Sequence, residues 1–265
     1  MSMTVRTNIA SMQASGQLNR TQKNLSSTLG RISSGLRITQ AADDAAGLGV
    51  ATSLETDVIS TKQAMRNAND GISIIQTAES ATNEVTDILQ RMRELAVQSA
   101  SETLANEERS YIQDEFVELR SEVARIAAVT EFNGVQLTDG TTTSLDVQVG
   151  IDNNTASRIT IQLGDLTTTT LNLASVALQT VTGARGALDI IDTALGSVNQ
   201  TRSRLGATVN RLEASINATH AYGIALTMAS SRLTDADYAK ETSEFTKFQI
   251  LMVAGGASMV HHKPS

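Results

Sequence analysis

Aromatic side chains, tryptophan above all, are scarce in this sequence. Only 3% of the 265 residues are aromatic and none is tryptophan, so the bulky burial on which most globular cores depend is not available. The hydrophobic residues, 40% of the chain, are almost all aliphatic, and such residues suit the thin seams between packed helices. The single proline is Pro264, so no proline upstream interrupts a long helix by removing an N–H donor.

Cysteine is absent, which excludes disulfides and thiol chemistry. The formal net charge of −7 disfavours the basic surface that nucleic acids require. No stretch reaches about 18 consecutive apolar residues, so no membrane-spanning helix is expected. The first eight residues lack the apolar region of a cleaved signal peptide. We therefore expect a cytoplasmic protein, or one exported by a route that leaves the chain uncleaved.

Apolar residues recur at the three- and four-residue spacing of paired helices over most of the chain. The spacing predicts helices around residues 18–36, 45–100, 112–126 and 183–216. A final segment, 233–259, holds three of the seven aromatic residues. At about 1.5 Å per residue, the longest helix would extend on the order of 80 Å. Such a helix does not fit a compact globule of this size, so the sequence predicts a rod.

The seam positions of these helices are the predicted inter-helix core. They are Leu89, Met92, Ile112, Phe116, Leu195, Val198, Leu205 and Leu212. One seam position is occupied by Arg202 instead of an apolar residue. Two interpretations stay open for this arginine: it sets the register of the helices, or it pairs with a carboxylate of the facing helix.

Between about residues 131 and 180 the apolar period changes to two, which is typical of strands. Asn133-Gly134 predicts a tight hairpin turn, and residues 145–149 and 159–163 predict two strands joined through residues 152–154. The expected fold is mainly α. A long antiparallel helical, coiled-coil rod pairs the N- and C-terminal segments, and a small β-hairpin region lies in the middle of the chain.

Ordered motifs extend over nearly the whole chain. In the N-terminal half they occupy residues 29, 31–38, 43–48, 66–73 and 89–98 and the tripeptide Phe132-Asn133-Gly134. In the C-terminal half they occupy residues 205–207, 210–213, 231–233, 235, 237–239 and 249–251. On these motifs the sequence resembles bacterial flagellin, the subunit of the flagellar filament. Residues 131–180 leave no room for the large outer domains of many flagellins, so the resemblance is to a minimal type.

The resemblance implies that the chain forms two domains. Residues 1–42 and 226–265 would form an inner coiled-coil domain; residues 43–180, which include the β-hairpins, and residues 181–225 would form a rod domain. The implied function is that of a structural, non-enzymatic subunit without cofactor or metal, which assembles with copies of itself into the extracellular filament used for motility.

The resemblance also implies partners and an export route. Export would proceed through the flagellar type III apparatus, with a chaperone bound to the C-terminal helices. Hook-junction and cap proteins would contact the filament, and the vertebrate Toll-like receptor for flagellin would bind it from the host side. Neither nucleic acid nor membrane is an implied partner.

Two sets of residues carry the implied contacts. By resemblance, subunits and the receptor would contact Gln90, Arg91, Glu94, Leu95 and Glu115; the alternative is a solvated helix face with i,i+3 and i,i+4 pairs. The second set would act in terminal assembly, and it consists of Leu25, Ile32, Leu36, Phe245, Phe248 and Leu251. Because the terminal segments cannot bury these apolar residues alone, their ordering is expected to be coupled to assembly.

Four aspartates could be proposed as acid/base pairs: Asp43 with Asp44, and Asp235 with Asp237. Since the sequence shows neither a pocket nor a partner that would shift their pKa values, we predict that they cap helices. No His-Glu-x-x-His motif marks a metalloprotease.

The sequence departs from the family pattern after Leu251. The apolar end that is usual in flagellins is replaced by a basic one, His261-His262-Lys263-Pro264-Ser265. This departure leaves a second function open: a flagellin-like surface or interaction protein that does not polymerise but binds a receptor, a polysaccharide or a chaperone.

Overall fold

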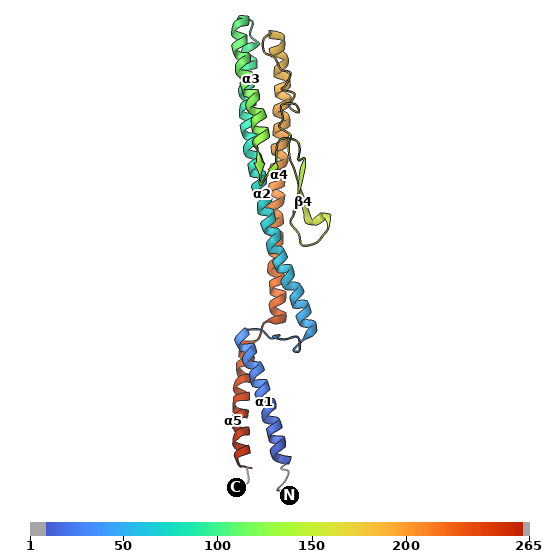
Figure 1. Ribbon diagram of the computed structural model, residues 1–265, viewed down its shortest axis with the longest axis vertical. Helices are drawn as coiled ribbons and strands as arrows, with labels where there is room; N and C mark the ends of the chain where they lie inside the picture. Colours follow the sequence, from blue (N-terminus) through green and yellow to red (C-terminus); the bar gives the residue numbers. More distant parts are fainter. Residues whose placement is uncertain (1–8, 262–265) are drawn as a thin grey trace. The chain divides into compact units, whose positions relative to one another are not determined.

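The computed structural model describes residues 9–261, and the chain divides into two compact units. Unit 1 holds the described residues up to Ile59 and from Gly223 onward, and unit 2 spans Ser60–Tyr222. Two long helices, α2 (Ala45–Ser99) and α4 (Val181–Thr234), contribute residues to both units (Figure 1). The predicted mainly helical fold, in which N-terminal helices pair with C-terminal ones, is confirmed. The predicted assignment of residues to an inner and a rod domain stays a prediction.

Unit 1 is built on the pairing of α1 (Ile9–Ser34) with α5 (Tyr238–His261) (Figure 1). A largely buried ion pair joins the two helices, with Arg31 Nε 3.0 Å from Glu241 Oε2. The connectors at the ends of α1 and α4 also pair. Gly35 adopts a left-handed φ of 71°, and its carbonyl accepts a hydrogen bond from the Ala236 N–H at 2.9 Å. The two connectors are thus tied to each other through backbone hydrogen bonds.

The aspartates before α2 divide their roles. Asp44 caps the helix, because its Oδ1 accepts from the Gly47 N–H at 2.8 Å. Asp43 Oδ2 instead accepts from the backbone N–H groups of Thr39 and Gln40, both at 3.1 Å, and these bonds hold the pKa of Asp43 below its ordinary value. The capping prediction was therefore wrong for Asp43, which closes the loop before the helix.

The second pair of aspartates divides in the same way. Asp237 Oδ1 accepts from the backbone N–H groups of Ala239 at 3.0 Å and Lys240 at 3.1 Å, and so caps the start of α5. Asp235 accepts from the Ser231 hydroxyl at the end of α4. The prediction that Asp235 caps a helix was wrong, because its carboxylate accepts from hydroxyl groups at the end of α4, those of Ser231 and Thr234, and from no backbone N–H of the described α5 residues.

Unit 2 contains a helical hairpin of α2 and α3 (Asn106–Val129) with α4 packed beside both (Figure 1). The predicted inter-helix residues Leu89, Met92, Ile112, Phe116, Val198, Leu205 and Leu212 are buried, and Leu195 is half-buried. They fall into two apolar clusters, one among α2, α3 and α4 and one between α2, α4 and the β region. The partly exposed Arg202 lies between Val198 and Leu205, where its Nε is buried without a hydrogen-bond partner.

The predicted β-hairpins are confirmed. β1 (Glu131–Phe132) and β2 (Val135–Gln136) pair across a two-residue turn in which Asn133 and Gly134 have φ values of 50° and 78°. Positive φ at both central positions is what a type I′ turn requires.

A larger hairpin pairs β3 (Ser144–Gln148) with β4 (Arg158–Gln162) in antiparallel register, after a short 3-10 turn η1 (Thr155–Ser157). This hairpin packs on α2 at Gly71, where an added Cβ would lie only 3.1 Å from Val147 Cγ2. Asn67 Nδ2 donates to the Gln148 carbonyl at 3.1 Å and fixes the same contact. The glycine thus allows a close approach, and a Cβ at this position would require the Val147 side chain to shift by a few tenths of an ångström.

The connector between β4 and α4 has no regular structure over most of its length, yet it contributes to the core. Leu166, Leu171, Leu173, Val176 and Leu178 are all buried. The connector is held near its α4 end by two buried polar groups: Ser99 Oγ donates to the Leu178 carbonyl, and Gln113 Oε1 accepts from the Leu178 N–H.

Asp165 in this connector is expected to make the stability of the fold depend on pH in acid. Burial raises the pKa of Asp165, but hydrogen bonds from Thr170 and Thr167 lower it by more, so the net pKa lies below the ordinary 3.8. The carboxylate therefore stabilises the fold above pH 3.8, and this stabilisation is lost as the pH falls through the lower folded pKa. We expect the difference in Tm between wild type and Asp165→Asn to be constant near neutrality and to shrink in acid. A difference that does not vary with pH contradicts this account.

Candidate subunit-contact site

Four exposed polar residues on α2 and α3 form one connected surface, here named the α2–α3 band: Gln90, Arg91, Glu94 and Glu115. Arg91 lies at its centre. Arg91 Nη2 is 2.8 Å from Glu115 Oε1, and its Nη1 is 2.9 Å from Glu94 Oε2. Hydrogen bonding to Glu115, and then to Glu94, raises the pKa of the Arg91 guanidinium. The band is thus a fixed arrangement of charges that bridges two helices.

Exposure of the band limits its part in holding the subunit together. The side chains of Arg91, Glu94 and Glu115 are 51%, 69% and 45% exposed, and ion pairs screened by water contribute little to stability. An ordered surface network that contributes little to folding fits recognition of another molecule.

Leu95 differs from the other residues predicted for this site. It is 1% exposed and belongs to the core among α2, α3 and α4. In the folded subunit its side chain points from α2 into this core, although the neighbouring Glu94 is exposed. Its predicted role as a contact residue stays a prediction.

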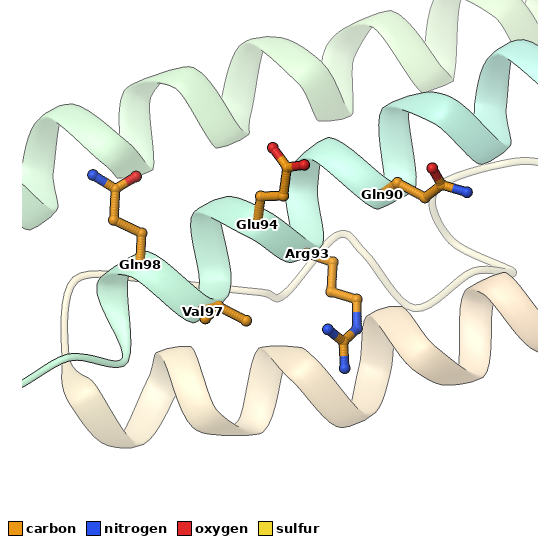
Figure 2. A pocket seen from close by; sticks show the side chains of 5 residues that line it. All are labelled: Gln90, Arg93, Glu94, Val97 and Gln98. Atoms are coloured by element: carbon orange, nitrogen blue, oxygen red, sulfur yellow. The ribbon is translucent and has the colours of Figure 1, made fainter.

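A shallow hollow of about 510 Å³ lies along α2 and shares Gln90 and Glu94 with the band. Its lining consists of Gln90, Arg93, Glu94, Val97 and Gln98. Figure 2 shows Glu94 and Gln98 turned toward α3, whereas Arg93 points toward α4; Arg93 Nε is 2.6 Å from Asp192 Oδ1. Sequence reasoning did not select Arg93, Val97 or Gln98, although all three lie in the motif at residues 89–98.

Two family descriptions match the chain over separate segments. The bacterial flagellin N-terminal helical region matches residues 5–143, which is more than half of the chain, and the C-terminal helical region matches residues 188–262. The chain belongs to the bacterial flagellin family. It is therefore a structural, non-enzymatic subunit of the extracellular flagellar filament, polymerises with copies of itself and serves motility.

Similar flagellins come from several bacteria. The flagellin of Halalkalibacterium halodurans is 42% identical over 229 residues, with 86% of this chain and 84% of the relative covered. The flagellin of Bacillus subtilis and the flagellar filament 33 kDa core protein of Treponema phagedenis are each 35% identical, with 97% of this chain and 95% of the relative covered. The resemblance to flagellin is thus confirmed over nearly the full length.

Solved structures agree on the fold. The crystal structure of Bacillus cereus flagellin is similar with a TM-score of 0.52 and 29% identity, over 58% of this chain and 88% of that one. A hook-associated protein from Vibrio parahaemolyticus shares the fold alone, with a TM-score of 0.61 and 15% identity over 73% of this chain and all of that one.

The six residues predicted for terminal assembly of the flagellin lie in unit 1. Leu36 and Leu251 are exposed, while Leu25, Ile32, Phe245 and Phe248 are half-buried. Leu251 also lines a hollow of about 350 Å³ between α1 and α5, together with Leu18 and Thr21. The pairing of α1 with α5 therefore covers only part of the apolar surface of these helices.

Sequence reasoning missed four strongly exposed apolar residues in the described part of this unit. They are Ile9, Met12, Ile250 and Val253, each more than 60% exposed. The signal was present as consecutive apolar residues, because in the run 250–253 no heptad seam can bury every position.

Within residues 9–261, no group of three or more His, Asp or Glu residues is arranged to hold a metal ion. No helix in that same range is long and apolar enough to cross a membrane. His262, one of the paired histidines of the predicted basic end, lies outside the described residues.

Proposed function

We propose that neighbouring copies of this flagellin contact each other through two surfaces. One is the α2–α3 band of unit 2, and the other is the exposed apolar surface of unit 1. The observation that carries the proposal is the exposure of Ile250 and Val253, 63% and 75%, on a helix that already has a partner in α1. Burial of such side chains against other subunits stabilises the assembly by about 25 cal/mol for each Å² of apolar surface removed from water.

The division of the chain in the filament follows from the same surfaces. An inner domain of residues 1–42 and 226–265 would bury its apolar faces among neighbours, since α1 and α5 do not cover them. A rod domain of residues 43–180 and 181–225 has an apolar core of its own. Its folding would therefore not depend on neighbouring subunits, which it would contact only through its surface. Folding of the inner domain would then be coupled to assembly.

The α2–α3 band is tested by Arg91→Ala combined with Glu115→Ala. We expect the Tm of the monomer to change little, because the pair is exposed, and the growth of filaments from wild-type seeds to slow about tenfold or more. Light scattering follows growth, and circular dichroism gives the Tm.

The matched control is Glu122→Ala with Arg125→Ala, which removes another exposed ion pair of α3, 2.5 Å long, outside the band. This control is expected to grow at the wild-type rate. Equal growth of the band variant and the control would remove the band from the proposal.

Further partners are proposed from the family resemblance and from exposed surface. An export chaperone would cover the apolar side chains of α5, and hook-junction and cap proteins would bind at the ends of the filament. The vertebrate Toll-like receptor would bind the α2–α3 band. The Arg91→Ala, Glu115→Ala variant tests the receptor claim as well, because undiminished receptor signalling by its monomer would exclude the band as the receptor site.

A further inference from the structure

Charge is distributed unevenly within unit 2. Residues 79–143 and 163–199, which hold α3 and the helix segments packed on it, contain sixteen acidic and six basic residues and are named the acidic part. Residues 60–78, 144–162 and 200–222, which hold the larger hairpin and the helix segments beside it, contain four acidic and six basic residues and are named the basic part. The net charges are −10 and +2, so a single unit offers both signs at different places along its helices.

The acidic part has an exposed face on α3 that is available for contact with another molecule. Glu107, Tyr111, Asp114 and Glu118 follow one another on α3 at spacings of four, three and four, so they lie on one side of the helix. All four are exposed, and Tyr111 is 66% exposed. None of the three carboxylates forms an ion pair within residues 9–261. Tyrosine is enriched at protein–protein interfaces, whose rims are polar. These four residues are named the α3 face.

The basic part offers the complementary charges. Arg204 and Arg211, seven residues apart on one side of α4, are both exposed and make no ion pair among the described residues. On the same helix Arg202 has a buried Nε without a partner. Among the described residues, the guanidinium groups of this part of α4 therefore form no ion pair within their own subunit.

We propose that the α3 face of one copy binds Arg204 and Arg211 of another copy in the filament. This inference rests on the proposed polymerisation through unit 2 and names the charges that direct it. In this arrangement the contact is heterologous, because the α3 face of each copy meets the arginines of the next copy, and a heterologous contact that does not close produces a helical filament. If a copy were added in the opposite orientation, its acidic part would meet the acidic part of the neighbouring copy. Charge repulsion between these parts would disfavour that orientation, so charge sets the direction in which subunits add.

The test is a charge swap, followed as elongation from seeds at low salt. The Arg204→Glu, Arg211→Glu variant and the Asp114→Arg, Glu118→Arg variant are each expected to elongate their own seeds about tenfold more slowly than wild type. The chain with all four substitutions is expected to return to within about threefold of wild type, since each contact is restored with its signs exchanged. Raising the salt concentration from about 0.01 M to about 1 M screens these charges, so the elongation rates of the variants and of wild type should become equal.

Glu213→Arg is the matched control, because it changes an exposed residue of α4 two positions from Arg211 without removing positive charge. It should elongate at the wild-type rate or faster. Reversal variants that elongate like wild type overturn the inference, and so does a four-substitution chain that keeps a wild-type Tm but does not recover. A wild-type chain that forms no filaments contradicts the proposed function itself, so the two failures are distinguishable.

Discussion

Replacing Phe116 by alanine is expected to lower the free energy of unfolding by about 3–5 kcal/mol. Phe116 is fully buried where α3 packs on α2 and α4, and it is one of only four phenylalanines in the chain. With so few aromatic residues, the surrounding aliphatic side chains cannot fill the space by small shifts, so a cavity would remain.

Chemical denaturation of the full chain, followed by far-ultraviolet circular dichroism, measures this change. Tyr111→Ala is the control, because Tyr111 is an exposed aromatic residue of the same helix and should change the free energy by at most about 0.5 kcal/mol. A Phe116→Ala chain as stable as the control would mean that the α2–α3–α4 core does not hold unit 2 together.

Replacing Arg109 by methionine is expected to lower the free energy of unfolding by about 2–4 kcal/mol. The Arg109 side chain is buried, and its guanidinium donates to three backbone carbonyls at the α2–α3 turn: Ser99 at 3.0 Å, Ser101 at 2.6 Å and Leu104 at 2.7 Å. Methionine would retain much of the volume but leave these acceptors without their donor.

Arg120→Met supplies the comparison, because Arg120 lies on the same helix and donates to one carbonyl, that of Ala174, at 2.9 Å. Its replacement should cost about 1 kcal/mol or less. Hydrogen exchange locates the effect, and Arg109→Met should lose protection first at the end of α2 and the start of α3. Uniform loss of protection, or equal destabilisation by both variants, contradicts the assigned role.

Regular features of the sequence predicted regular features of the structure. Seam residues such as Leu89, Leu205 and Leu212 are buried as the heptad spacing indicates. Asn133-Gly134 forms the predicted tight turn, because few other residue pairs adopt two positive φ values at low cost. These predictions depend on local geometry, which the sequence encodes within a few residues.

Features that depend on distant contacts were not predicted. The period of two was expected to extend to about residue 180, but residues 164–180 form no strand. Leu173 and Leu178 are nevertheless fully buried, because α2 and α3 supply the other side of their pocket. Arg109 has no sequence signal that separates it from an exposed helix arginine, since its acceptors are backbone carbonyls. Leu95 lies in a motif with exposed residues, and only the packing of three helices shows that it points inward.

The most direct test of the filament account concerns the exposed apolar surface of unit 1. The full chain and its Ile250→Asp, Val253→Asp variant are purified as monomers, seeded and viewed by negative-stain electron microscopy. The account predicts long filaments from the wild-type chain. It predicts none from the variant, whose monomer should retain the wild-type Tm because both side chains are already exposed. Filaments of equal number and length from both chains would contradict it, since that surface would then have no part in assembly.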